Sequence, residues 1–217
     1  MVFEDNQIVK KHYVKRAEIL SNLNLFRDSV TTYETNLKTL NAECNVSHLS
    51  EYLFENQPSI IRKIRCNCGL QSERKCVIVN VNVDKLLDEG LASMEETILD
   101  ADPLVRRRCS SCGDFVAEEQ VEYGPHLLID LSIFTDENYL KGRSITLPSL
   151  DEIAPSVKLG GKMYMMAGAV HWAQRHYTAY VKTGTFWHLY DDLQKKRKLV
   201  KHDQKIQPHL LVYIIRK

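Results

Sequence analysis

The sequence lacks any uncharged stretch long enough to cross a lipid bilayer. Its first residues, MVFEDNQIVKKHYVKR, also lack the apolar run and the small-residue cleavage site of a secretory signal. We therefore expect an intracellular protein of the cytoplasm and/or nucleus, without a membrane partner. Because that compartment is reducing, the six cysteines are better explained as metal ligands, catalytic thiols or buried side chains than as disulfide partners.

The sequence also lacks an excess of either charge. The 29 Lys and Arg residues against 28 Asp and Glu residues leave a net charge of +1. The molecule as a whole therefore lacks the excess of positive charge that is typical of nucleic-acid-binding proteins. One local basic run remains, formed by Lys195, Lys196, Arg197 and Lys198. Such a run is more typical of a solvated hairpin between the last two strands than of a phosphate-binding surface, and we do not expect a nucleic-acid partner.

No internal repeat, low-complexity linker or clean domain boundary is visible in the 217 residues, of which 44% are hydrophobic. Apolar residues recur at helical spacing over residues 8–40, with a break near Asn24 or Asp28, and residues 48–54 predict another helix. Alternating or β-branched segments then predict strands at residues 77–83, 126–131, 163–172, 176–181, 185–189 and 210–215. A helical front followed by an antiparallel sheet predicts the α+β class.

Two close cysteine pairs, Cys66 with Cys68 and Cys109 with Cys112, supply four thiolates if the segment between them folds back. Tetrahedral zinc takes four such ligands, and a glycine directly follows each pair, as a tight knuckle turn requires. We predict a structural zinc site with no open position for catalysis. Two unrelated pairs of buried thiols are the alternative, and Cys76 is expected to stay outside the site.

The segment from Ala167 to Val181 contains a histidine at the start of one predicted strand, His176, and Asp191 follows the next. A carboxylate that holds an imidazole in one tautomer is the usual support of a Cys or Ser nucleophile. More often, however, a His and an Asp on neighbouring strands form only a satisfied polar pair.

The sequence around this dyad resembles the histidine box of the ubiquitin-specific protease family. His-Tyr-Thr-Ala-Tyr-Val is followed by Trp, then by Tyr-Asp-Asp, and finally by an apolar terminal strand. The resemblance covers the finger and histidine-box portion and implies a partial papain-like cysteine protease fold. Residues 1–47 would be a helical N-terminal segment, and residues 48–217 the zinc-bearing fingers and the palm sheet.

The family reaction is thiol-dependent hydrolysis of ubiquitin, or a ubiquitin-like modifier, from its conjugates. By resemblance, His176 is the general base, Asp191 orients it and Asp192 is a neighbouring polar support. Two positions depart from the family pattern: Arg175 stands where glycine is usual, and the first cysteine pair has a one-residue gap.

A nucleophile box, Gly-Asn-Thr-Cys-Tyr or similar, is missing from this chain. Cys44 is a weak candidate, because only 22 positions separate it from Cys66. A truncated sequence, an inactive relative and a divergent enzyme that uses Cys44 are the possible explanations, in that order. We predict weak or absent hydrolysis by the chain alone. The alternatives are a non-catalytic module that binds ubiquitin or a ubiquitin-like protein and, second, a zinc-containing nucleic-acid-binding protein.

Overall fold

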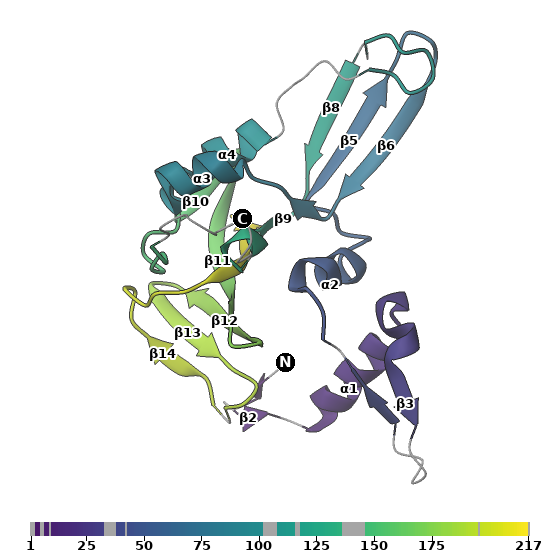
Figure 1. Cartoon of the computed structure of the whole chain (residues 1–217). Coiled ribbons are helices and arrows are strands. Elements are labelled where there is room, and N and C mark those ends of the chain that lie inside the picture. Colours follow the sequence, from purple (N-terminus) through teal and green to yellow (C-terminus); the bar gives the residue numbers. More distant parts are fainter. Residues whose placement is uncertain are drawn as a thin grey trace.

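The computed structural model describes residues 3–4, 7–8, 10–32, 38–41, 43–101, 108–115, 118–135, 146–194 and 196–216. Within these residues the main sheet has eight strands in the order β14-β13-β12-β11-β15-β9-β7, with β10 paired to β11 (Figure 1). The strands are β7 (Ile78–Val79), β9 (His126–Asp130), β10 (Ser156–Leu159), β11 (Lys162–Ala173), β12 (His176–Thr183), β13 (Phe186–Tyr190), β14 (Lys198–Val200) and β15 (Pro208–Ile215). All pairs are antiparallel except β7 with β9, so the predicted α+β class is confirmed.

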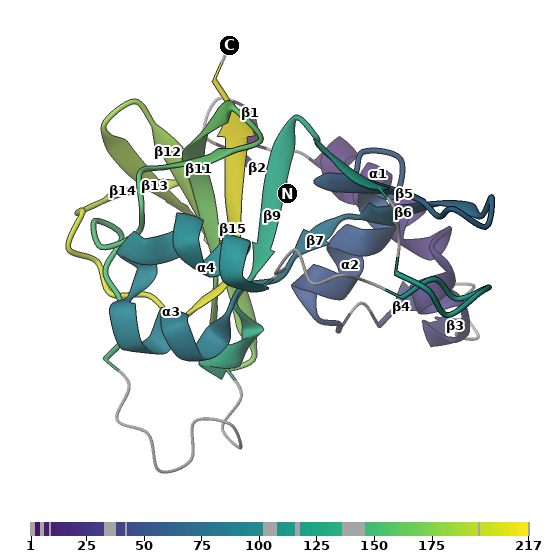
Figure 2. The ribbon, with the colours of Figure 1, turned by 90° about the horizontal axis from the view of Figure 1, so that it is seen from above.

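The two faces of the main sheet carry two separate cores. Since neighbouring side chains in a strand point to opposite faces, Leu211 and Tyr213 of β15 enter one core, and Leu210 enters the other. Helices α3 (Val83–Glu89) and α4 (Met94–Ala101) cover the larger core, as Figure 2 shows. Helix α2 (Val46–Leu53) covers the smaller core and leaves the rest of that face for a pocket.

A second, three-stranded sheet projects from the main sheet in Figure 1, and we call it the finger sheet. It consists of β5 (Ile60–Arg65), β6 (Gln71–Cys76) and β8 (Glu118–Tyr123) in the order β6-β5-β8. Most of its side chains are exposed or half-buried, so it has little apolar core of its own. Two ion pairs link its strands: Arg62 lies 3.0 Å from Glu119, with both side chains largely buried, and Lys63 lies 2.6 Å from Glu122. The second pair is exposed and adds little free energy.

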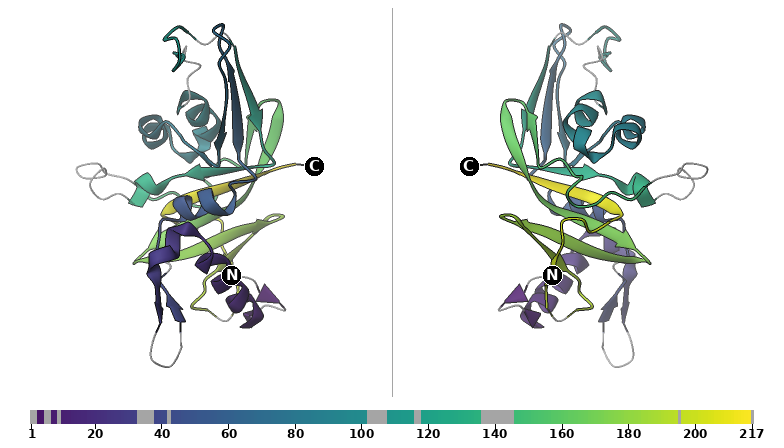
Figure 3. Two further views of the ribbon diagram at one scale, coloured as in Figure 1. Left: turned by 90° about the vertical axis from the view of Figure 1, so that its right-hand side faces the viewer. Right: turned by 90° about the vertical axis from the view of Figure 1, so that its left-hand side faces the viewer.

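The N-terminal region is only partly helical. Helix α1 (Lys10–Ser21) ends before a 3-10 helix (Asn24–Ser29), which confirms the break predicted near Asn24. A hairpin of β3 (Val30–Thr32) and β4 (Lys38–Leu40) then replaces the expected second helix, because Val30, Thr31 and Thr32 are β-branched. A short hairpin, β1 (Phe3–Glu4) with β2 (Gln7–Ile8), precedes α1. In Figure 3 these elements and the finger sheet lie at opposite ends.

One other prediction needs correction. The expected strand at residues 77–83 is reduced to β7, because the Asn82 side chain accepts a hydrogen bond from the Lys85 amide (3.2 Å) and caps α3. Helix α2 itself begins at Val46. The remaining predicted strands and the helix near residues 48–54 are confirmed. None of the described helices is long and apolar enough to span a bilayer.

Candidate functional site

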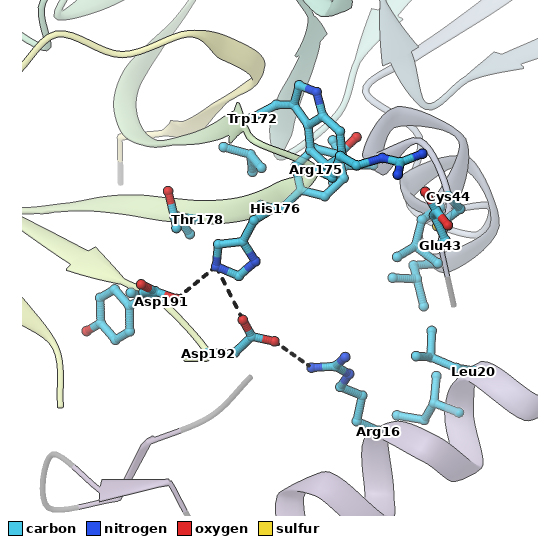
Figure 4. A pocket seen from close by; sticks show the side chains of 18 of the residues that line it. Arg16, Leu20, Glu43, Cys44, Trp172, Arg175, His176, Thr178, Asp191 and Asp192 are labelled. Carbon is cyan, nitrogen blue, oxygen red and sulfur yellow. Dashed lines mark hydrogen bonds and ion pairs between the residues drawn. The ribbon is translucent and has the colours of Figure 1, made fainter. Parts of the chain in front are cut away.

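The structure brings His176 and Asp191 together at one end of the β12–β13 hairpin. His176 is the first residue of β12, and Asp191 follows β13 directly, so the antiparallel register that pairs Ala179 with Tyr190 carries both to the same end. The His176 Nε2 atom lies 2.8 Å from the Asp191 Oδ1 atom. Figure 4 shows that the other ring nitrogen, Nδ1, points into the pocket. The Asp191 carboxylate therefore holds the His176 ring from one side, while Nδ1 on the other side faces the pocket as a proton acceptor.

Asp191 itself is fixed by a second donor, the backbone amide of Leu193, at 2.9 Å from Oδ1. Partial burial raises the pKa of the Asp191 carboxyl, but hydrogen bonds from His176 and the Leu193 amide outweigh it and leave the pKa below its ordinary value. Asp191 is therefore ionised at neutral pH and able to stabilise a protonated imidazole.

Asp192 lies near the same ring nitrogen, with its Oδ1 atom 3.5 Å from His176 Nε2. Its Oδ2 atom is 3.9 Å from the Nη1 atom of Arg16, on helix α1. Sequence reasoning missed Arg16, because nothing in the spacing indicates that α1 reaches a site more than 170 residues further along the chain.

The turn that precedes His176 is strained. Ala173 pairs with His176, and the two residues between them, Gln174 and Arg175, have positive φ angles of 50° and 61°. Such φ values at both positions are those of a type I′ turn, which favours Asn-Gly. Glycine would suit position 175 better than arginine. Arg175 therefore differs both from the glycine of the family pattern and from the residue that this turn prefers.

A pocket of about 1030 Å³ opens in front of the dyad, on the sheet face that α2 covers in part. Its walls come from α1, the segment before α2, α2 itself and strands β11 to β13. Most of the lining is apolar, and it includes Leu20, Leu49, Val170, Trp172, Ala179 and Val181. The dyad occupies one wall of this apolar groove.

Cys44 lines the same pocket, and Figure 4 shows it on the wall opposite His176. It stands one residue before Asn45, the N-cap of α2, whose side chain already accepts from the amides of Ser47 (2.7 Å) and His48 (3.4 Å). The Cys44 thiol therefore lies before the first turn of α2, whose free amides and positive dipole end would favour a thiolate. Burial raises the pKa of the Cys44 thiol, which opposes the thiolate further.

A polar contact fixes α2, and therefore the Cys44 wall, to the sheet. Asp130, at the end of β9, accepts hydrogen bonds from Ser47 Oγ (2.8 Å) and from the backbone amide and hydroxyl of Ser132 (3.1 and 2.9 Å). Asp130, which sequence reasoning did not single out, therefore helps to position the pocket wall that carries Cys44.

The four cysteines of the predicted metal site converge at the tip of the finger sheet, where their sulfurs all lie within 4.8 Å of one another. Cys66 and Cys112 have sulfurs 3.6 Å apart, and those of Cys68 and Cys109 are 3.7 Å apart. Ligands of a tetrahedral zinc ion with Zn–S bonds of about 2.3 Å are about 3.8 Å apart, so the four thiols fit this geometry.

Backbone conformation at the tip supports the same interpretation. Gly69 and Gly113, one after each pair, have φ angles of 91° and 77°, which other residues rarely adopt. Backbone amides of Cys112 and Ser111 donate toward the Cys109 sulfur and lower the pKa of that thiol to about 7. Metal binding requires deprotonated thiols, and the amides at this turn favour that state for Cys109, whereas burial and the neighbouring thiols raise the pKa of Cys112 to about 12. Cys76 ends β6 and lies outside this group.

Of the basic run, Lys196 and Arg197 lie between β13 and β14, and Lys198 is the first residue of β14. The sequence did not predict β14, so the run does not simply join the last two strands. Lys195 lies outside the described residues. The Arg197 guanidinium donates to the Tyr190 hydroxyl at 3.2 Å. Part of the run is thus engaged with the sheet.

No protein-family model matches this sequence, and no curated protein matches it significantly. Solved structures similar to the chain include the SAGA DUB module Ubp8/Sgf11/Sus1/Sgf73 bound to monoubiquitin, with 18% identity and a TM-score of 0.43. The match covers 97% of this chain and 49% of that one. An essential yeast splicing factor has 12% identity and a TM-score of 0.46, over 95% of this chain and 53% of that one. The chain thus spans about half the length of both, and at these TM-scores neither likeness identifies a function.

Proposed function

We propose that this chain is a ubiquitin-specific-protease-like protein whose pocket takes the C-terminal tail of ubiquitin or a ubiquitin-like modifier. The observation that carries the proposal is the 2.8 Å contact between His176 Nε2 and Asp191 on the wall of an apolar pocket. In the family reaction His176 would accept the proton of a thiol at Nδ1, Asp191 would orient the ring, and Asp192 would support the pair.

The nucleophile is the missing part of this proposal. Among the described residues that line the pocket, Cys44 is the only thiol, and both its position before the cap of α2 and its raised pKa oppose thiolate formation. We therefore expect the chain alone to bind its partner with weak or absent hydrolysis. The same observation favours the second candidate, a non-catalytic binding module.

Structural zinc at the four finger cysteines belongs to the same proposal. Zinc would provide a closed tetrahedral link between the β5–β6 hairpin and the loop at residues 108–115. The exposed finger strands need such a link, because they bury little apolar surface. Thiolate ligands persist in reducing compartments, so the proposal includes a cytoplasmic and/or nuclear location.

The test combines a thiol-reactive ubiquitin with a binding titration. The purified chain is incubated with ubiquitin that carries a thiol-reactive C-terminal group, and its intact mass is measured. We expect no adduct, together with saturable binding of unmodified ubiquitin or a ubiquitin-like protein by calorimetry. A stoichiometric adduct on Cys44, or turnover of a ubiquitin C-terminal amide that His176→Ala abolishes, would refute the expected inactivity.

Matched variants locate the binding surface. Val181 lines the pocket and is 37% exposed, whereas Leu199, 66% exposed, lies on β14 outside the pocket lining. Val181→Asp should weaken binding by about tenfold or more, because it places an unpaired charge in an apolar contact. Leu199→Asp should leave the affinity within about twofold. Equal effects of the two variants, or no binding by the unaltered chain to any such modifier, would contradict the proposal.

A further inference from the structure

The proposed function does not use the basic run, and the structure places part of that run on a free edge of the main sheet. Strand β14 is the last strand on one side of this sheet, and Figures 1 and 2 both show it at the sheet margin. Within the described residues, no strand pairs with the outer side of β14. Such an edge presents backbone N–H and C=O groups that can pair with another extended chain.

The β14 edge also exposes apolar side chains. Leu199, in the middle of β14, is 66% exposed, and Phe186, at the start of β13, is 57% exposed. Leu199 pairs with His188, and Phe186 stands two residues before His188, so both apolar side chains lie on the same face of the sheet. A chain added beside β14 would remove these apolar groups from water.

The other face and the two ends of β14 are basic. Val200 packs against the larger core, so Lys198, two residues earlier, projects from that face, while Lys196 and Lys201 flank the strand. All three lysines are exposed, and no described residue forms an ion pair with them. Asp203 is the only acidic residue near β14 in the sequence. Lysines at a short edge strand oppose pairing with a second copy of that strand and attract an acidic chain.

We propose that β14 is a docking edge for an acidic, extended peptide segment of a partner protein, which adds a strand to the main sheet. Because side chains alternate along a strand, the segment that fits has apolar residues on the face of Leu199 and Phe186, and acidic residues on the face of Lys198. Main-chain hydrogen bonds would hold the segment, and the two faces would select its sequence. This docking edge involves neither the pocket nor the dyad.

The test uses the full chain and a fluorescein-labelled octapeptide of alternating glutamate and valine, with fluorescence anisotropy as the readout. We expect saturable binding below millimolar concentration that weakens with added salt. Hydrogen exchange should show new protection at residues 198–200 when the peptide is bound. An octapeptide of alternating lysine and valine should bind at least about tenfold more weakly, because it carries the same charge as the edge.

N-methylation of the peptide separates strand addition from simple charge attraction. Two versions of the acidic octapeptide are methylated at the two alternate sets of backbone amides. The version that loses the donors facing β14 should bind about tenfold more weakly than the other, because N-methylation removes those hydrogen bonds and leaves every charge in place. Equal binding of the two versions would overturn the proposal.

Matched variants of the chain locate the contact. Lys198→Glu and Leu199→Asp should each weaken binding of the acidic peptide by about tenfold or more, the first by repulsion and the second by a charge in an apolar contact. Lys75→Glu makes the same charge reversal at an exposed position of β6, the edge strand of the finger sheet, and should leave the affinity within about twofold. Circular dichroism of all three variants verifies that they fold.

Two further outcomes would overturn the proposal. One is the absence of binding by the acidic octapeptide. The other is tighter binding of a single-stranded oligothymidylate that Lys198→Glu weakens and Leu199→Asp does not, which would assign the edge to nucleic acid. Because Leu199→Asp is expected to leave ubiquitin binding intact, this proposal and the proposed function fail independently.

Discussion

Replacing Arg175 by glycine should make the protein more stable, although it shortens a long side chain beside the candidate base. Arg175 is held at a φ angle of 61° in the two-residue turn before His176. The left-handed conformation costs about 1–2 kcal/mol for a residue with a Cβ atom. Glycine removes that strain but adds about 0.5–1 kcal/mol of backbone entropy to the unfolded chain. The difference predicts a gain of about 0.5–1 kcal/mol for Arg175→Gly.

For a chain of this length, the gain corresponds to a rise of about 1–4 °C in the unfolding midpoint. Thermal and urea unfolding can be followed by the fluorescence of Trp172, which pairs with Tyr177 beside the turn, and of buried Trp187. Arg175→Ala is the control, because it removes the guanidinium but keeps the Cβ atom. The alanine variant should stay within about 0.5 kcal/mol of the parent chain. Equal stabilisation by both substitutions, or destabilisation by glycine, would show that backbone strain is the wrong explanation.

Three further predictions concern the finger sheet and the histidines. Gly124→Ala should destabilise the root of the finger sheet by about 2 kcal/mol or more in urea unfolding, because a Cβ atom would lie 2.2 Å from the Pro58 carbonyl oxygen; an unchanged midpoint would refute this. Chelation of metal should remove hydrogen-exchange protection from β5, β6 and β8 while the main sheet stays protected, since the finger strands bury little surface; simultaneous loss of both would contradict a local metal role. Burial lowers the pKa values of His126, His171 and His209, so the unfolded chain binds protons that the folded chain does not, and stability should fall as pH drops below about 6.5. His126→Leu should flatten that decline in urea midpoints measured between pH 7.5 and 5.5, and a slope identical to the parent chain would count against it.

Local pattern was enough for much of the sheet. Short segments rich in β-branched, aromatic and other apolar residues, separated by turn or polar residues, located β9, β11, β12, β13 and β15 to within a few residues. The Cys-x-Cys and Cys-x-x-Cys spacings likewise indicated the four cysteines that converge at the finger tip, since a glycine at each turn is a local requirement. Local pattern failed at β3 and β4. Val30 and Leu40 fit a helical spacing, but Val30, Thr31 and Thr32 are β-branched, and strand pairing decided between the two structures.

The sequence by itself determined the residue types of the site: the histidine and two aspartates at the ends of neighbouring strands, and the four cysteines in two pairs. Only the tertiary structure decided their environment. It placed Arg16 from helix α1 against Asp192, left the Asp192 Oδ1 atom without a hydrogen bond, and set Cys44 on the far wall behind the cap of α2. These relations join segments far apart in the chain, so they depend on packing free energy summed over the whole fold, which no local pattern records.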